Sequence, residues 1–138
     1  MRFTVYDLAD GLALRLGISA SLAVSGLAHA YLYVDGYRHI PNIGTAFLVQ
    51  SAAFVALAIL ILVGGPGWLR VFAGVGAAGA LVAFALSRTT GLLGFTEVGW
   101  EPSPYALATV VAEVVTVAAC ALWLFSNNRM RPRTVSDG

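Results

Sequence analysis

Four polar side chains that could do chemistry interrupt an otherwise strongly apolar sequence: His29, Gln50, Arg88 and Glu113. Glu113 is the most informative, because an acidic side chain in hydrocarbon costs about 2.5–3.5 kcal/mol and must be paired or protonated. Such a carboxyl can carry a proton, or it can bind a cation or a substrate amine. It can also hydrogen-bond to His29, Gln50 or Arg88 and so fix the register of neighbouring helices. Either interpretation predicts a polar pocket around Glu113.

His29 could ligate haem or a metal, relay a proton, or hydrogen-bond across the core of the protein. Haem held by two histidines would need a partner at similar depth, but His39 follows Gly36 in a loop. Zinc or copper would need three or four ligands, and the available set mixes loop and mid-helix positions: His29, His39, Asp35 and Glu113. We therefore predict no metal site, and haem ligation by His29 stays open as an alternative.

The composition indicates which elements position these side chains. Apolar residues (AVILMFWYC) make up 59% of the 138 residues and charged residues only 11%, whereas a soluble domain carries about 25% charged residues. A net charge of +1 offers no basic surface for phosphates, which excludes a nucleic-acid-binding protein. The single cysteine, Cys120, allows no internal disulfide. The chain is therefore predicted to be one integral membrane domain.

A membrane-spanning helix needs about 20 largely apolar residues, and four stretches of the chain qualify. They cover approximately 12–33, 43–63, 70–87 and 105–125, and the segments between them contain turn formers or charges. The stretches lack the period-two alternation of a membrane β-barrel. We predict an all-α fold, an antiparallel four-helix transmembrane bundle, followed by a tail over 126–138.

The arginines predict the orientation, because the chain contains no lysine. Arg38 and Arg88 lie on one side of the predicted bundle. Six arginines lie on the other: Arg2, Arg15, Arg70, Arg129, Arg131 and Arg133. The positive-inside rule then predicts a multi-pass protein of the plasma membrane, with both termini and the 126–138 tail in the cytoplasm.

The depth of the polar residues places them in the outer half of the bundle. His29 is about five residues, or roughly 8 Å, from the outer end of its span, at 1.5 Å per residue. Gln50 and Glu113 are each about eight residues, or on the order of 12 Å, from that end. Arg88 closes the third span and can reach inward or outward. We therefore predict an outward-facing pocket formed by these four residues.

Two helical faces support this pocket. In the first span, small residues spaced by four lead to the histidine: Gly17, Ser21, Ser25 and His29. In the fourth span, one face carries Tyr105, Thr109, Glu113, Thr116 and Cys120. Helices in a bilayer associate through small and polar residues, so we expect these two faces to contact each other.

The external segment 87–104 is long for a loop of a helix bundle. It combines apolar and acidic side chains that could close over the pocket as a lid: Phe95, Glu97, Trp100 and Glu101. In that arrangement Arg88 would pair with a substrate anion or with Glu113. Alternatively, the segment rests on the membrane surface.

In the segments His29–Gly44, Ser87–Phe95 and Trp100–Pro102, the chain resembles small four-span membrane proteins of actinobacteria, an uncharacterised family. Its arginine-only, alanine-rich composition suits such high-GC organisms. In Leu14–Ile18 and Gly26–His29 it is more loosely similar to DoxX-like four-helix proteins. This second resemblance implies an association with membrane redox chemistry.

The favoured hypothesis is a non-catalytic accessory or small-ligand-binding membrane protein, attached to a redox complex. It would associate with a membrane-protein partner or with a second copy. A second hypothesis is a small proton-coupled transporter in which Glu113 exchanges a proton for substrate. A third is an oxidoreductase subunit with haem on His29. No catalytic residue is identified from the sequence, so a role other than that of an enzyme is favoured.

Overall fold

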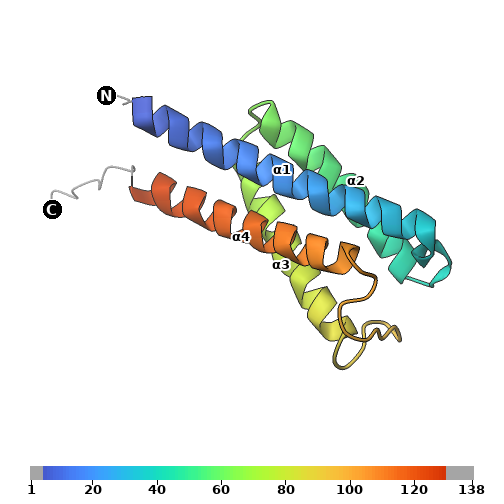
Figure 1. The fold of residues 1–138 in the computed structure, drawn as a ribbon. Coiled ribbons are helices and arrows are strands. Elements are labelled where there is room, and N and C mark those ends of the chain that lie inside the picture. Colours follow the sequence, from blue (N-terminus) through green and yellow to red (C-terminus); the bar gives the residue numbers. More distant parts are fainter. Residues whose placement is uncertain (1–4, 130–138) are drawn as a thin grey trace, which may run out of the picture.

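The computed structural model describes residues 5–129, with side chains from residue 11 onward, and these residues form helices and no β-strand (Figure 1). The elements are α1 (Val5–Asp35), the 3-10 helix η1 (Tyr37–His39), α2 (Ile43–Leu62), α3 (Trp68–Ser87) and α4 (Tyr105–Arg129). The all-α prediction is confirmed. All four α-helices are long and apolar enough to cross a membrane.

The helix ends differ modestly from the predicted spans. Helix α1 begins at Val5, before the predicted start at 12, although its apolar candidate span covers Gly11–Asp35. Helix α4 continues to Arg129, so the first residues of the predicted tail are helical. The rest of that tail, with Arg131 and Arg133, lies outside the described residues, as does Arg2.

Glycines determine how the chain leaves and enters α2. A Cβ on Gly44 would lie 2.6 Å from the carbonyl oxygen of Tyr37 and 2.9 Å from the Cα of Arg38. Only glycine therefore lets the first turn of α2 pack directly on η1. At the other end, Gly64 has a φ of +90°, the left-handed conformation in which many helices stop.

Helix α1 packs against both α2 and α4, and α3 packs mainly against α4 (Figure 1). The buried core draws on all four helices: Ile18, Leu22, Phe54, Ala58, Ile61, Leu69, Ala73, Ala77 and Cys120. Small residues permit close approach, because a Cβ on Gly26 of α1 would lie 3.0 Å from Cγ2 of Val55 on α2. The single cysteine, Cys120, is buried in this core.

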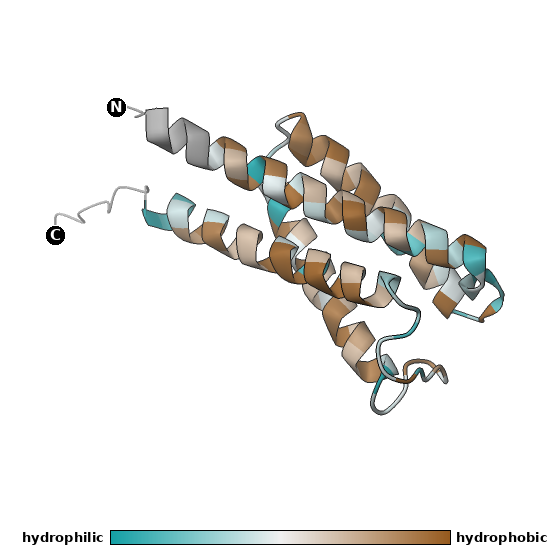
Figure 2. Cartoon of the chain, in the orientation of Figure 1, coloured by the Kyte–Doolittle hydropathy of each residue, from teal (hydrophilic) through white to brown (hydrophobic). Residues whose placement is uncertain are grey.

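The outer surface of the helices is apolar. Large side chains such as Leu27, Val75 and Phe125 are more than 60% exposed, and hydrophobic residues follow all four helices (Figure 2). Water would oppose so much exposed apolar area, whereas lipid would solvate it. The fold is therefore that of a multi-pass membrane protein.

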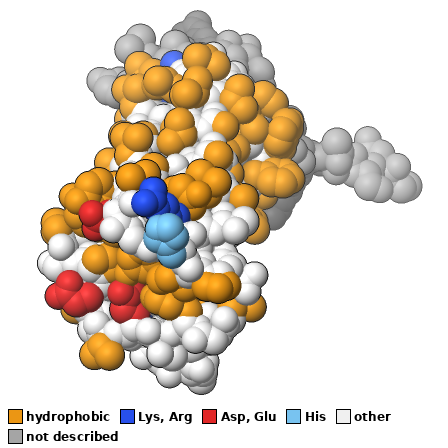
Figure 3. Space-filling view, turned by 90° about the vertical axis from the view of Figure 1, so that its right-hand side faces the viewer, with side chains coloured by type: hydrophobic (Ala, Val, Ile, Leu, Met, Phe, Trp, Pro, Cys, Tyr) orange, Lys and Arg blue, Asp and Glu red, His pale blue; other side chains and the backbone are white. Residues whose placement is uncertain are grey.

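The two ends of the bundle differ in charge. The first turn of α1 and the last turn of α4 lie at the same end (Figure 1), where the Arg70 guanidinium lies 5.1 Å from the ring centre of Trp123. The opposite end carries η1 and the segment 88–104. Viewed from that end, acidic, basic and histidine side chains gather among apolar ones (Figure 3).

Candidate functional site

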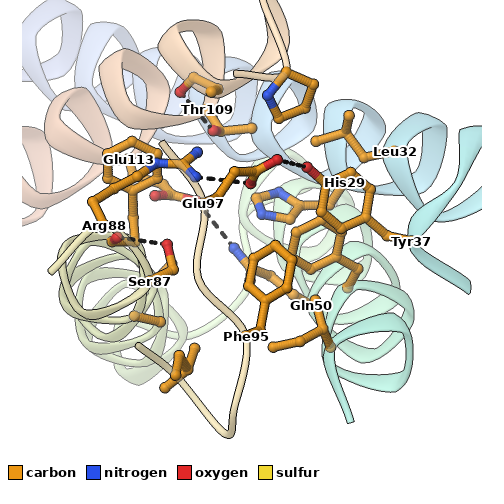
Figure 4. Close-up of a pocket in the computed structure, with 18 residues that line it drawn as sticks. His29, Leu32, Tyr37, Gln50, Ser87, Arg88, Phe95, Glu97, Thr109 and Glu113 are labelled. Carbon is orange, nitrogen blue, oxygen red and sulfur yellow. Dashed lines mark hydrogen bonds and ion pairs between the residues drawn. The ribbon is translucent and has the colours of Figure 1, made fainter. Parts of the chain in front are cut away.

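A cavity opens between the helices and the segment 88–104 (Figure 4). Its empty volume is about 580 Å³ including the opening, of which about 80 Å³ admits the centres of water-sized molecules. The four predicted pocket residues all line it. The full lining comprises His29, Leu32, Tyr37, Ile43, Phe47, Gln50, Ala80, Ala83, Phe84, Ser87, Arg88, Leu92, Phe95, Glu97, Pro102, Ala106, Thr109 and Glu113.

Glu113 lies at the inner side of this cavity and is only 2% exposed. Its Oε1 accepts a hydrogen bond from Ser25 Oγ at 2.9 Å and another from Gln50 Nε2 at 3.0 Å. The carboxyl thereby joins α1, α2 and α4. Of its three predicted partners, Gln50 contacts it directly. Neither His29 nor Arg88 has a hydrogen bond to it.

The second carboxyl oxygen of Glu113, Oε2, has no hydrogen-bond partner among the described residues. Oε2 also keeps some accessible surface, because it is absent from the fully buried polar atoms that lack a partner. Because Glu113 lines the cavity and is otherwise enclosed, the remaining surface of Oε2 opens into this space.

His29 lines the same cavity. Its Nδ1 lies 2.9 Å from the backbone oxygen of Ser25. Since a carbonyl oxygen cannot donate, Nδ1 carries the proton of this bond, and Nε2 of the neutral ring has a free lone pair. The ring is held edge-on to Phe47, with centroids 4.9 Å apart. Ser25 thus contacts both the imidazole and the Glu113 carboxyl, which makes it their shared neighbour.

Three side chains link η1 to the segment 88–104 at the mouth of the cavity. We call them the rim cluster: Tyr37, Arg88 and Glu97. Arg88 Nη1 forms an ion pair with Glu97 Oε2 at 2.8 Å, and the Tyr37 hydroxyl donates to Glu97 Oε1 at 2.5 Å. Burial, and secondarily this hydrogen bond, raises the pKa of Tyr37 above its usual value. Arg88 therefore pairs with Glu97, and the predicted alternative of pairing with Glu113 is not adopted.

The four predicted lid residues divide into two groups. Phe95 and Glu97 line the cavity. Trp100 is 55% exposed, packs beside Phe84 with ring centroids 5.7 Å apart, and does not line the cavity. Glu101 does not line it either: its backbone oxygen accepts from Arg88, and its carboxylate accepts from the backbone N–H of Ser103.

Haem and metal ligands do not converge here. His39 lies on η1 and its Nε2 accepts a hydrogen bond from Arg38 at 2.9 Å, whereas His29 is buried between helices. Among the side chains that the structure describes, those of residues 11–129, no three His, Cys, Asp or Glu come together in a way that could hold a metal ion. The haem alternative therefore receives no second histidine at the depth of His29.

A second polar contact lies one helical turn deeper. The hydroxyls of Ser21 and Thr116 are 2.7 Å apart, so α1 and α4 are joined at two successive levels. This agrees with the expectation that the face bearing Ser21, Ser25 and His29 contacts the face bearing Glu113 and Thr116.

Comparison of the chain with protein-family models, with curated proteins and with solved structures finds no match. The functional conclusion therefore depends on the geometry of the cavity.

Proposed function

We propose that this protein is a plasma-membrane protein that binds a small ligand in its cavity and has no catalytic role of its own. The observation that carries the proposal is that Glu113 and His29 line one cavity, while Glu113 Oε2 and His29 Nε2 have no hydrogen-bond partner among the described residues. Ionisable groups are costly in a membrane interior, and those found there mark substrate sites, ion pathways or proton relays.

The lining of the cavity supports this proposal, and its size limits the ligand. About 80 Å³ admits the centres of water-sized molecules, which is less than the about 300–1,000 Å³ of typical small-molecule sites, so only a small ligand would fit. The lining is mostly aliphatic and aromatic with a few convergent polar groups, which is the usual composition of a binding site. The rim cluster closes part of the mouth, and so restricts the ligand to a compact molecule.

The proposal includes an antiparallel bundle with both termini in the cytoplasm, so that the cavity opens to the outside. Arg15, Arg70 and Arg129 belong to the end opposite the cavity, as the positive-inside rule requires of a cytoplasmic face. Single cysteines at Glu101 and at Ser126, each in a Cys120→Ala background, test the orientation. An impermeant maleimide added to whole cells should label the first variant and not the second.

A pair of neighbouring substitutions tests ligand binding. Ala83 lines the cavity, while Val82 beside it is 60% exposed on the outer surface of α3. Protein purified from native membranes should retain a small molecule detectable by native mass spectrometry. Ala83→Trp should abolish its retention by filling the cavity, and Val82→Trp should leave it unchanged. Equal retention by both variants would contradict a ligand in this cavity.

Proton-coupled transport is a second candidate, favoured by one observation. Both described partners of Glu113, Ser25 and Gln50, are neutral, so the carboxyl is free to exchange a proton for a substrate. Transport predicts that Glu113→Gln abolishes uptake driven by a pH gradient in vesicles while the variant still folds. Uptake that persists in Glu113→Gln would exclude this candidate.

A further inference from the structure

We infer that the ligand of this cavity is a small primary or secondary amine in its protonated form, attached to a compact apolar body. The inference rests on the proposed function, because it names the chemical class that the same cavity accepts. It follows from two properties of the lining: which hydrogen-bonding atoms are already used, and which charges are already balanced.

Two hydroxyl side chains, Ser87 and Thr109, contribute open acceptors to the cavity. The hydroxyls of Ser87 and Thr109 donate their single protons to backbone oxygens of Phe84 and Ala106 at 2.7 and 3.0 Å. Their oxygen lone pairs stay available, since a hydroxyl has one proton and two acceptor sites. The Tyr37 proton is likewise used by Glu97.

The two innermost open atoms are also acceptors, namely Glu113 Oε2 and His29 Nε2. Gln50 donates one of its two N–H protons to Glu113. Arg88 donates to Glu97 and to the backbone of Glu101, and its Nε is a buried donor without a partner among the described residues. That open donor belongs to the rim cluster, whereas the open atoms of Glu113, His29, Ser87 and Thr109 are acceptors. A ligand that fits must bring N–H or O–H groups, and an ammonium brings up to three.

The charges of the lining favour a cation over a neutral donor. The ionisable side chains around the cavity come from α1, α4, η1 and the external segment: His29, Tyr37, Arg88, Glu97 and Glu113. Arg88 and Glu97 neutralise each other at 2.8 Å. This leaves the Glu113 carboxyl without an opposite charge, although Ser25 and Gln50 donate to its Oε1. A single positive charge at Oε2 would balance it, as a buried carboxylate requires.

The aromatic wall suits the body of such a ligand. Tyr37 stacks on Phe47 at 4.9 Å, and Phe95 lies 6.0 Å from Tyr37; all three line the cavity. Aromatic faces also attract ammonium groups. A quaternary ammonium would gain this attraction but would bring no N–H for the open acceptors.

Four probes that share a phenylethyl body test the inference: 2-phenylethylamine, 2-phenylethanol, 3-phenylpropionate and 2-phenylethyltrimethylammonium. Binding to the full chain in lipid nanodiscs is measured by calorimetry. The primary amine should bind at least about tenfold more tightly than the alcohol, because hydrogen bonds to charged groups contribute more than neutral ones. It should also bind more tightly than the quaternary cation and the carboxylate. Glu113→Gln should bring the affinity ratio of amine to alcohol close to one.

The outcomes separate this inference from the proposed function. If the alcohol or the carboxylate binds as tightly as the amine, and Ala83→Trp abolishes that binding, the cavity binds ligands but the inferred class is wrong. If none of the probes binds, the inferred class is also wrong, and the retention of a native small molecule then decides the proposed function. If Ala83→Trp and Val82→Trp both leave that retention unchanged, the proposed function fails as well. The comparison of probes on the unmodified protein holds even if Glu113→Gln does not fold.

Discussion

Replacing Ser25 by alanine tests whether the Glu113 carboxyl organises the helices. Ser25 is completely buried on α1, and its Oγ donates to Glu113 Oε1 on α4 at 2.9 Å. Ser25→Ala removes this bond and leaves the carboxyl with Gln50 as its described donor. Because the site is closed to bulk water on this side, no solvent molecule takes the place of the hydroxyl without a shift of α1 or α4.

The magnitude follows from the chemistry of the bond. Hydrogen bonds between membrane helices contribute about 0.6 kcal/mol on average and up to about 1.7 kcal/mol. Bonds to charged acceptors in proteins generally contribute about 1.5–3 kcal/mol. We therefore expect Ser25→Ala to lower the free energy of unfolding by about 1–2 kcal/mol. Titration of the purified protein with sodium dodecyl sulfate, followed by circular dichroism, measures this quantity.

Ser19 provides a matched control on the same helix. It is also buried, but its Oγ has no hydrogen-bond partner among the described residues. Ser19→Ala should therefore leave the free energy of unfolding unchanged or raise it, because it removes an unsatisfied polar group. The reasoning would be refuted if Ser19→Ala cost as much as Ser25→Ala, or if the latter were neutral.

Three further predictions concern the rim cluster, η1 and the core. The pKa of Tyr37 is raised above its unfolded value of about 10, so its contribution to stability is present below pH 10 and is lost as the pH rises through the folded pKa. Tyr37→Phe should abolish this alkaline loss, measured as the difference in unfolding free energy between the two proteins from pH 8 upward; a parallel loss in both would contradict it. Gly44→Ala should destabilise the fold by more than about 2 kcal/mol, because its Cβ would overlap the backbone of η1. Gly79→Ala on α3 should cost nothing in the same denaturation assay, since nothing lies within 4 Å of its added Cβ. The buried Cys120 thiol should react with a maleimide only after denaturation, and rapid labelling of the folded protein would show that the core is open.

The fold was predictable because membrane helices follow from length and apolarity. The pocket was also predictable to the extent that depth could be counted along each span. His29, Gln50 and Glu113 each lie within about two to three turns of one end, and a bundle that pairs these ends must bring them together. That reasoning requires no knowledge of side-chain conformation.

The individual partners were less predictable. Ser25 was visible as a small residue one turn before His29, but a helical serine can bond to its own backbone or across to a neighbour. Its spacing does not decide between these two. In the structure the Ser25 hydroxyl bonds across to the neighbouring helix α4, with Glu113 as acceptor.

The mouth of the cavity depends on the path of a loop. A loop has no regular spacing of side chains from which their directions could be predicted. Tyr37 was not among the predicted pocket residues, but it lies on η1 and its hydroxyl donates to Glu97. Glu97 then competes successfully with Glu113 for Arg88, since it is nearer along the loop. Trp100 and Glu101 point elsewhere because the chain turns at Gly99, which has a φ of +65°. The predicted association with a redox complex and the resemblances to actinobacterial and DoxX-like proteins stay predictions.

The most direct measurement of the central claim is the rate at which charged thiol reagents enter the cavity. Ala83→Cys in a Cys120→Ala background places a thiol in the cavity lining while Glu113 is retained. Impermeant cationic and anionic methanethiosulfonates are added to the outside of sealed cells, with Val82→Cys as the lipid-facing control. The account predicts that Ala83→Cys reacts, that the cation reacts faster than the anion, and that 2-phenylethylamine slows the reaction. A cysteine at position 83 that is unreactive from outside, or that reacts faster with the anion, would contradict it.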